Sequence, residues 1–520
     1  MLSVTLSVLA AAALATAQGP IVDLGYAQYQ GAVDPATNVA SFLGLRYAAA
    51  PLGDLRFRAP QAPVNVSGVQ SATTQPNECF QAASGRSPTN PLAARAIVQT
   101  EDCLFLSVYY PSDASGAPPE NLPTLVWIHG GGYLGGAASS FNGADLIKQS
   151  NNGIVVVTIQ YRLGVFGFLP GTAVKQDGAL NAGLLDQDFA LRWVNQNIAK
   201  FGGDPAAVTI WGESAGAGSV LQHIVSNGGN TEPQLFRGAI TSSTFLPSQY
   251  RYNDRIPELL FSEVVSQTNC TSSTDDMACL RAVPAGTLQT ANTNINTAGF
   301  FGTFVLVPVI DGEFITQPVT NALRSGQVNG QRVLAVTNAF EGQVFVNQSV
   351  NTTAAAYSLA LFPDFTTEES NTVGRIYAGQ GSNVAQANLV QGESIFICPS
   401  YFLLRAFANN SYKAEFAVPP ALHGNDIVYY FPGTSTPPFN NTQFINAFAQ
   451  SFSNFIISLD PNVKVSNTIT PPWPLYSLGS VEMLFNRTAA GAPDVRVVPT
   501  DEALDLRCAF WNEASSNTAQ

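Results

Sequence analysis

The sequence is poor in histidine and in positive charge, and each shortage excludes a class of protein. Only three histidines occur among 520 residues. The six cysteines include no pair at the C-x-x-C spacing typical of zinc sites. Lysines and arginines number 23 against 36 acidic residues, a net charge of −13, whereas nucleic-acid phosphates require basic patches. We therefore expect neither a bound metal nor a nucleic-acid partner.

Long apolar runs are also scarce. The stretch 2–17 is apolar, but its 16 residues are short for a membrane span of about 20. It ends in Ala15-Thr16-Ala17, a small-x-small cleavage pattern, so residues 1–17 are predicted to be a signal peptide. We therefore expect a secreted, extracellular chain without stable membrane insertion.

Two further features agree with export. An even number of cysteines behind a signal peptide predicts three disulfides, although six cysteines allow 15 pairings. Seven N-x-S/T sequons predict N-glycans, at Asn65, Asn269, Asn347, Asn351, Asn409, Asn440 and Asn486.

No linker, repeat or low-complexity tract divides the remaining 18–520. Hydrophobic residues make up 46% of the chain, ample for a large core. Strand-like and helix-like stretches alternate from 124 to 224, which predicts a mainly parallel central sheet flanked by helices. We expect one large α/β domain.

The pentapeptide Gly212-Glu213-Ser214-Ala215-Gly216 points to chemistry. An apolar, strand-like run (207–211) precedes it and a helix-compatible stretch (217–224) follows. G-x-S-x-G between a strand and a helix is the nucleophile elbow, whose tight turn needs glycine on both sides. The alternative is a chance serine in a glycine-rich loop, but this interpretation does not account for the strand before the motif and the helix after it. Ser214 is therefore the predicted nucleophile.

A serine hydroxyl needs a base, and the three histidines leave little choice. His223 lies nine residues beyond Ser214 on the same predicted helix and points back toward the sheet. His129 begins a glycine-rich run that is better explained as an oxyanion-hole loop than as the source of the base. His423 remains and is the predicted base.

The third member of such a triad is a buried carboxylate, which in the order Ser–acid–His lies between 214 and 423. Glu341 follows a strand-like run (332–337) and stands in a turn. Asp311, before Gly312, has a similar setting. The pattern alone barely separates Glu341 from Asp311.

At this point the chain resembles the type-B carboxylesterase/lipase family, which includes fungal lipases and carboxylesterases, cholinesterases and animal carboxylesterases. The matching motifs keep their order and approximate spacing along nearly the whole chain, at 55–57, 101–104, 129–132, 161–164, 183–187, 201–205, 212–216, 307–312, 423–424 and 508–512. The resemblance implies an α/β-hydrolase fold with a flap loop over an active-site gorge. It also selects Glu341, because the family's acid stands in an N-x-x-E-G setting that 338–342 matches. A supporting serine is implied at Ser242, although the family's usual next glycine is Ser243 here.

The resemblance further implies how the scaffold is fastened. It suggests ion pairs between Arg56 and Glu101 and between Arg162 and Asp186, more as scaffold than as catalysts. It also suggests three disulfides, which are Cys79–Cys103, Cys270–Cys279 and Cys398–Cys508.

The glycine run 130–135 has two interpretations. It formally matches the dinucleotide pattern G-x-G-x-x-G, but the next strand-like run ends at Gln160 without the acidic residue that this pattern needs. An oxyanion hole fits better, because glycine lets backbone N–H groups approach a substrate closely. By resemblance, the donors are Gly131, Gly132 and Ala215.

Specificity is less legible. By resemblance, the flap lies between Cys79 and Cys103, and its stretch 91–98 is apolar enough for transient lipid contact; a packed surface loop is an equal alternative. None of the five tryptophans lies there, which argues against a choline ester. By resemblance, Phe304 is expected to line the acyl pocket. Gly302 stands at a position where the family often has phenylalanine, which suggests room for a larger acyl group.

These features predict a secreted serine carboxylic-ester hydrolase with a Ser-His-Glu triad and an acyl-enzyme intermediate. Its substrate would be a small-molecule or lipid ester, and it needs no metal or organic cofactor. A triacylglycerol lipase and an aryl or feruloyl-type esterase are alternatives. A non-catalytic adhesion protein with a cholinesterase-like fold is a minor one, since such proteins typically lack the serine or the histidine.

Overall fold

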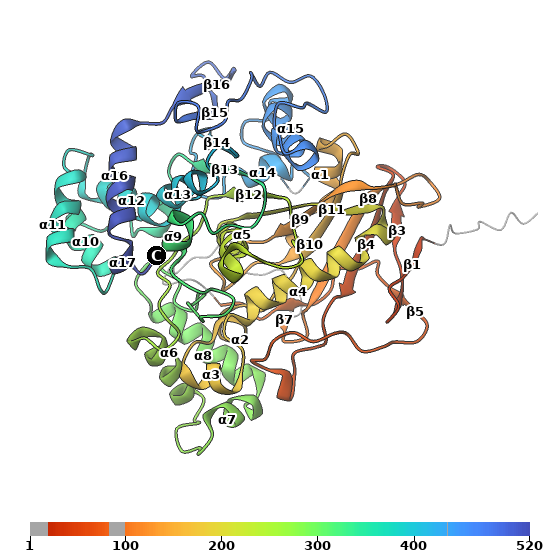
Figure 1. Cartoon of the computed structure of the whole chain (residues 1–520), viewed down its shortest axis with the longest axis horizontal. Coiled ribbons are helices and arrows are strands. Elements are labelled where there is room, and N and C mark those ends of the chain that lie inside the picture. The colour runs from red at the N-terminus through yellow and green to blue at the C-terminus, as the bar shows by residue number, and fades with distance from the viewer. Residues whose placement is uncertain (1–18, 83–98, 434) are drawn as a thin grey trace, which may run out of the picture.

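The computed structural model describes residues 19–82, 99–433 and 435–520. The predicted signal peptide 1–17 and the flap stretch 91–98 lie outside these residues. Within the described chain, one large sheet organises the molecule (Figure 1). Its eleven strands are, in spatial order, β16 (Pro493–Pro499), β15 (Val481–Arg487), β14 (Ser411–Phe416), β13 (Arg332–Asn338), β12 (Gly238–Ser242), β11 (Gly203–Glu213), β9 (Leu122–Ile128), β10 (Val155–Ile159), β8 (Phe105–Pro111), β4 (Val39–Arg46) and β3 (Ala32–Asp34).

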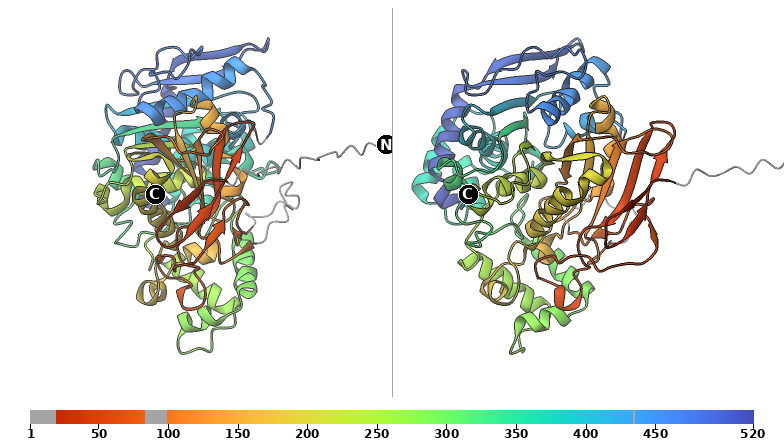
Figure 2. Two further views of the ribbon diagram at one scale, coloured as in Figure 1. Left: turned by 90° about the vertical axis from the view of Figure 1, so that its right-hand side faces the viewer. Right: turned by 45° about the vertical axis from the view of Figure 1, so that its right-hand side comes forward.

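The centre of this sheet is parallel and its edges are antiparallel. Parallel pairing runs without interruption from β10 through β9, β11, β12, β13 and β14 to β15. The strands β8, β4 and β3 add antiparallel pairs at one edge, and β16 adds one at the other. Figure 2 shows the amino-terminal strands and the carboxyl-terminal pair at opposite edges. The predicted α/β-hydrolase architecture with a mainly parallel sheet is confirmed.

Two further small sheets lie outside the large one. One contains β1 (Ile21–Asp23), β2 (Gln28–Gln30) and β5 (Val69–Ser71), and the other contains β6 (Glu78–Cys79) and β7 (Gln99–Thr100). The helices are α1 (Gly143–Gln149), α2 (Gly164–Phe168), α3 (Thr172–Asp177), α4 (Ala182–Asn197), α5 (Ala215–Val225), α6 (Arg255–Gln267), α7 (Asp276–Ala282), α8 (Ala285–Ala298), α9 (Val319–Arg324), α10 (Ala354–Leu361), α11 (Thr367–Ile376), α12 (Asn383–Gly392), α13 (Cys398–Ala406), α14 (Ile427–Tyr430), α15 (Thr442–Ser458), α16 (Glu502–Glu513) and α17 (Ser515–Thr518).

The central strands carry apolar side chains on both faces, as a sheet covered on both sides requires. Along β9, Leu125 and Trp127 point to one face, where Phe448 and Phe452 of α15 belong to the same core cluster. Val126 and Ile128 alternate to the other face, where they share a core with α4 and α5. Buried on both faces, the strands hold a rigid edge at their carboxyl ends, where the loops of the candidate site begin.

The three disulfides have the pairing that the resemblance implied, Cys79–Cys103, Cys270–Cys279 and Cys398–Cys508. The third joins the start of α13 to α16 across 110 residues of sequence. In the entropy model, closing a loop of that length stabilises the fold by about 4–5 kcal/mol.

Both predicted ion pairs are present and buried. The Arg56 guanidinium binds both oxygens of Glu101, with Nε–Oε1 and Nη2–Oε2 distances of 2.6 and 2.7 Å. Arg162 holds Asp186 in the same bidentate way, at 2.7 Å for both bonds. Removing one partner would leave a buried charge uncompensated, so each pair fixes the loops that it joins.

Candidate active site

Ser214 sits on a strained corner between β11 and α5. Its φ of 56° lies in a region that residues other than glycine rarely adopt. The flanking glycines are sterically required, since a Cβ on Gly212 would lie 2.3 Å from the backbone of Gly216, and one on Gly216 would lie 2.0 Å from the Ile128 carbonyl. The two glycines therefore permit a turn that raises the serine above the sheet edge.

His423 lies between Ser214 and Glu341. Its Nε2 is 2.9 Å from Ser214 Oγ, and its Nδ1 is 2.6 Å from Glu341 Oε2. Glu341 is 1% exposed, so its charge acts on the ring with little screening by water. The structure thus brings together the three predicted residues, from segments more than 80 residues apart, in one hydrogen-bonded series.

Neighbouring strands deliver the acid and the base. Glu341 follows β13 and His423 follows β14, its parallel partner. The two loops are themselves tied, because the Phe340 amide donates to the Ala421 carbonyl at 2.9 Å. The distance between acid and base is therefore held by the backbone as well as by their own hydrogen bond.

Ser243, rather than the predicted Ser242, supports the acid. Ser243 Oγ donates to Glu341 Oε1 at 2.8 Å, and the Asn338 amide donates to the same oxygen at 2.6 Å. Ser242, the last residue of β12, points to the other face and accepts from Trp211 Nε1 at 3.0 Å. The prediction of Ser242 was wrong because β12 ends at Ser242 and the chain turns at Ser243, whose φ of 59° is not that of a strand.

The glycine loop leaves backbone donors free beside the serine. Gly131 and Gly132 have φ values of 105° and 65°, in the region that favours glycine. Within the described residues, the N–H groups of Gly131, Gly132 and Ala215 donate to no backbone or side-chain acceptor. A Cβ on neighbouring Gly130 would be 3.0 Å from Ser214 Cβ, which places this loop against the nucleophile. These features suit an oxyanion hole.

The two other histidines are buried scaffold residues. His129 Nδ1 is 2.9 Å from the Gly130 carbonyl, and its ring stacks on Tyr161 at 4.5 Å. His223 Nε2 is 3.1 Å from Gln187 Oε1. Burial lowers the pKa of each ring to about 4. Both are thus neutral near pH 7, and neither contacts Ser214.

Asp311, the rival acid, is occupied elsewhere. Its carboxylate accepts from Asn181 Nδ2 at 2.6 Å and from the amides of Glu313 and Ile315. The described structure gives it no bond to His423. The turn that contains Asp311 therefore anchors a loop and does not supply the acid of the candidate site.

Two further carboxyl groups lie near the base, and no sequence motif indicates either of them. Glu213 Oε1 is 3.3 Å from His423 Nε2, and burial raises the Glu213 pKa to about 8. Asp426 is fully buried, accepts from Asn338 Nδ2 at 3.0 Å and from the Tyr430 hydroxyl at 2.9 Å, and has a pKa raised by burial.

Opposing effects act on His423. Burial by itself would lower its pKa, but the charge and hydrogen bond of Glu341, with smaller contributions from Glu213 and Asp426, leave the pKa above its usual value of 6.5. The imidazolium formed when this ring takes a proton is therefore stabilised.

Aromatic rings form the opposite wall. Phe304 packs against the glycine loop so tightly that a Cβ on Gly132 would lie 2.1 Å from its ring. Phe345 and Phe396 contact the His423 ring, with centroids 4.9 and 4.6 Å away. Behind Phe304 lies a cavity of about 210 Å³.

Gly302 borders this cavity but does not create it. A side chain there would point away, since a Cβ would lie 1.8 Å from the Phe345 carbonyl. The expectation that Gly302 leaves room for a larger acyl group is therefore wrong about the reason for the glycine. Glycine is required at this position because the backbone packs closely there.

The fold and the surroundings of Ser214 define the class: this is an α/β hydrolase whose candidate nucleophile is a serine. The chain belongs to the carboxylesterase family, whose model matches residues 18–492, and it is a carboxylic-ester hydrolase.

Similar proteins agree. The chain is 31% identical to the carboxylesterase patB of Aspergillus clavatus, over 96% of this chain and 97% of that protein. It is 30% identical to secreted lipase 1 of Botryotinia fuckeliana, over 85% of each. The crystal structure of Aspergillus niger EstA matches with a TM-score of 0.86 at 30% identity, covering 97% of this chain and 99% of that one.

Proposed function

We propose that this hydrolase is a secreted enzyme that cleaves carboxylic esters with the triad Ser214–His423–Glu341 through an acyl-enzyme intermediate. The observation that carries the proposal is the position of the His423 ring, 2.9 Å from Ser214 Oγ on one side and 2.6 Å from Glu341 on the other. A ring so held can take the hydroxyl proton and keep the right tautomer.

In the proposed cycle, His423 accepts the Ser214 proton as Oγ attacks the ester carbonyl. The resulting oxyanion is held by the free N–H groups of Gly131, Gly132 and Ala215. The carbon–oxygen bond to the alcohol then breaks, and His423 gives its proton to the leaving alkoxide. Water next attacks the acyl-serine, His423 takes one of its protons and returns it to Ser214, and the carboxylic acid leaves.

The test is Ser214→Ala, with p-nitrophenyl acetate and butyrate as substrates. Loss of nucleophile and base costs about 10⁶-fold in kcat in a comparable serine hydrolase, so turnover should fall to background. Ser219→Ala, on the same helix α5 and buried against Gln187, is the matched control and should retain activity. Undiminished turnover by Ser214→Ala would refute the triad.

Secretion and N-glycosylation complete the proposal. The three disulfides suit an oxidising compartment. None of the seven sequon asparagines is buried: Asn486 is partly exposed and the other six are exposed. In the described parts of the chain, every helix is too short or too polar to span a bilayer. A secreted product that loses mass on treatment with an N-glycosidase is the expected result.

A lipase is the second candidate, because several similar fungal proteins are named lipases. A series of p-nitrophenyl esters from acetate to palmitate, with and without an emulsion, separates the two. A jump in rate at the oil–water interface would favour the lipase, and a preference for short soluble esters would reject it. The adhesion alternative is disfavoured because serine and histidine are both present and hydrogen-bonded.

A further inference from the structure

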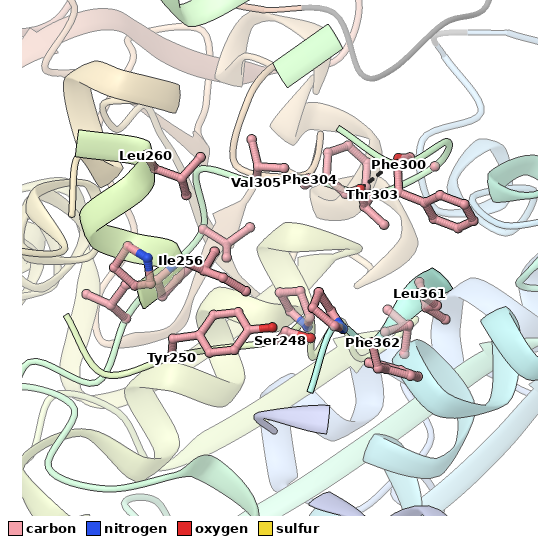
Figure 3. A pocket seen from close by; sticks show the side chains of 18 of the residues that line it. Ser248, Tyr250, Ile256, Leu260, Phe300, Thr303, Phe304, Val305, Leu361 and Phe362 are labelled. Atoms are coloured by element: carbon pink, nitrogen blue, oxygen red, sulfur yellow. Dashed lines mark hydrogen bonds between the residues drawn. The ribbon is translucent and has the colours of Figure 1, made fainter. Parts of the chain in front are cut away.

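The cavity behind Phe304 has an apolar body without charge. Its described lining includes Ile256 and Leu260 of α6, Val305, and Phe362 beyond α10, and no charged side chain among the described residues borders it. Figure 3 shows Phe300, Thr303, Phe304 and Val305 along one side of the space. A neutral group of the substrate would enter this cavity without losing hydration of a charge.

One aromatic ring stands between this cavity and the glycine loop. The Phe304 ring borders the cavity on one side and packs against Gly132 on the other. Its remaining contacts are ring edges, with Phe245 at 5.7 Å and Phe345 at 6.1 Å. No hydrogen bond holds the Phe304 side chain, so its ring could turn between the cavity and the glycine loop without breaking one.

Polar groups face Phe304 from the far side. Figure 3 shows the Tyr250 hydroxyl directed toward Ser248, across the space from the Phe304 side. Ser248 and Tyr250 both line the cavity. Gln391 also lines the cavity and is 2% exposed, and its side-chain oxygen accepts from the Tyr357 hydroxyl at 3.0 Å. The Tyr250 and Ser248 hydroxyls and the Gln391 amide group could hydrogen-bond to an oxygen of a ligand in this cavity.

We propose that this cavity binds the acyl group of the substrate, and that it selects an aryl-alkanoyl group with a phenolic or similar oxygen at its far end. The proposal rests on the ester hydrolysis proposed above and names its substrate class. The ring would lie among the apolar side chains, and its oxygen would meet Ser248, Tyr250 or Gln391.

The size of the cavity agrees with such a group. An apolar cavity of about 150 Å³ is known to hold benzene. The cavity here, about 210 Å³, has room for a ring and one additional oxygen. A long unbranched fatty acyl chain would have to bring its apolar end against the three polar groups, which disfavours a long-chain lipase substrate.

The first test uses a matched pair of substrates on the full chain. The value of kcat/KM is measured for ethyl 3-phenylpropanoate and ethyl 3-(4-hydroxyphenyl)propanoate, with p-nitrophenyl acetate as the small-acyl reference. One hydrogen bond gained should favour the hydroxylated ester about fivefold or more. Tyr250→Phe, which removes only an oxygen, should abolish much of that preference. Equal turnover of the two esters by the wild type would overturn the phenolic selectivity.

The second test fills the cavity. Leu260 lines it, whereas its neighbour Leu259 on α6 is 58% exposed. Leu260→Trp should lower the ratio of kcat/KM on the aryl esters to that on acetate at least tenfold, and Leu259→Trp should leave it unchanged. The same ratio in both variants would show that the acyl group lies elsewhere.

A binding measurement avoids the risk that Leu260→Trp fails to fold. 4-Ethylphenol matches the acyl tail without the ester and should inhibit turnover of the aryl esters competitively. Titration calorimetry with wild type and Tyr250→Phe should show binding that weakens in the variant; no heat with wild type would overturn the site. The proposed function is supported if Tyr250→Phe still hydrolyses p-nitrophenyl acetate and Ser214→Ala does not. This result does not depend on what the cavity binds, so failures of the two proposals are distinguishable.

Discussion

The two walls of the candidate site are built by different means. On the catalytic side, directional bonds hold each group, and Glu341 alone accepts from His423, Ser243 and the Asn338 amide. On the proposed acyl side, Phe304 meets Phe245 and Phe345 through ring edges, and a cavity lies behind it. Hydrogen bonds weaken steeply when misaligned, whereas apolar contacts tolerate repacking. Chemistry is thus fixed by one wall, and specificity can vary on the other.

Among the tests of this contrast, Glu341→Gln is expected to have the largest effect on activity. The amide keeps the size of the side chain but presents the wrong hydrogen-bonding pattern to His423, so kcat should fall by about 10³–10⁴-fold. Asp311→Asn is the control, because this second buried acid is bonded to Asn181 instead. If the two variants lost activity equally, the acid would be misassigned. Thermal unfolding of each variant excludes a loss of fold.

Gly132→Ala tests the border between the walls. Its Cβ would lie 2.1 Å from the Phe304 ring, at a φ that disfavours alanine, so an oxyanion donor should be displaced and kcat should fall by about 10²–10³-fold. Gly135→Ala, in the same loop, is the control, since its nearest atom is 3.4 Å away. If Phe304→Ala restored part of the lost rate, the clash with the ring would be the cause.

Ser243→Ala against Ser242→Ala tests the correction within the triad. Removing the Ser243 hydroxyl leaves a Glu341 oxygen with one donor fewer, which at about 1–2 kcal/mol predicts a loss of about five- to thirtyfold in kcat. Ser242→Ala, which loses its bond to Trp211, should affect unfolding more than kcat. The opposite order would restore Ser242 to the role first predicted.

The smallest effect is expected in the pH profile. In the proposed mechanism activity needs neutral His423, whose pKa is raised by Glu341, Glu213 and Asp426 against the effect of burial. The wild-type kcat/KM should therefore rise with pH and reach half of its plateau above 6.5. Asp426→Asn removes one negative charge facing the ring, so that midpoint should move to lower pH. The plateau should fall by less than about tenfold, because Asn keeps part of the hydrogen bonding.

In the same profile, the Tyr430→Phe variant separates charge from hydrogen bonding. It removes the donor to Asp426 but leaves the carboxyl group in place. Its midpoint should therefore move much less than that of Asp426→Asn. Equal shifts in both variants would show that the charge of Asp426 does not reach His423.

Much of the catalytic side was predictable from local patterns. The elbow around Ser214 is defined within five residues, because backbone sterics dictate both glycines. His423 followed from elimination, since the chain has only three histidines. Glu341 was not separable from Asp311 by pattern, because both stand in turns after apolar runs. Only the resemblance distinguished them, and the bond to His423 agrees with that choice.

Other features of the site had no local signal. Ser242 and Ser243 are adjacent and identical, and which one faces Glu341 depends on how β12 ends. Glu213 sits inside the elbow motif, yet its proximity to His423 arises from a loop more than 200 residues away. The cavity behind Phe304 is assembled from the loop after β12, from α6, from the loop between α8 and α9, from the end of α10 and from α12.

The amino-acid sequence by itself determined the class of chemistry. The nucleophile elbow and the glycine loop are both short motifs, and their backbone conformations depend on neighbouring residues rather than on distant contacts. Tertiary structure decided which serine supports the acid, how many carboxyl groups surround the base, and what the acyl wall can admit. Those properties depend on distances between side chains far apart in the chain, and such distances are set only when the parallel strands align their carboxyl ends at one edge.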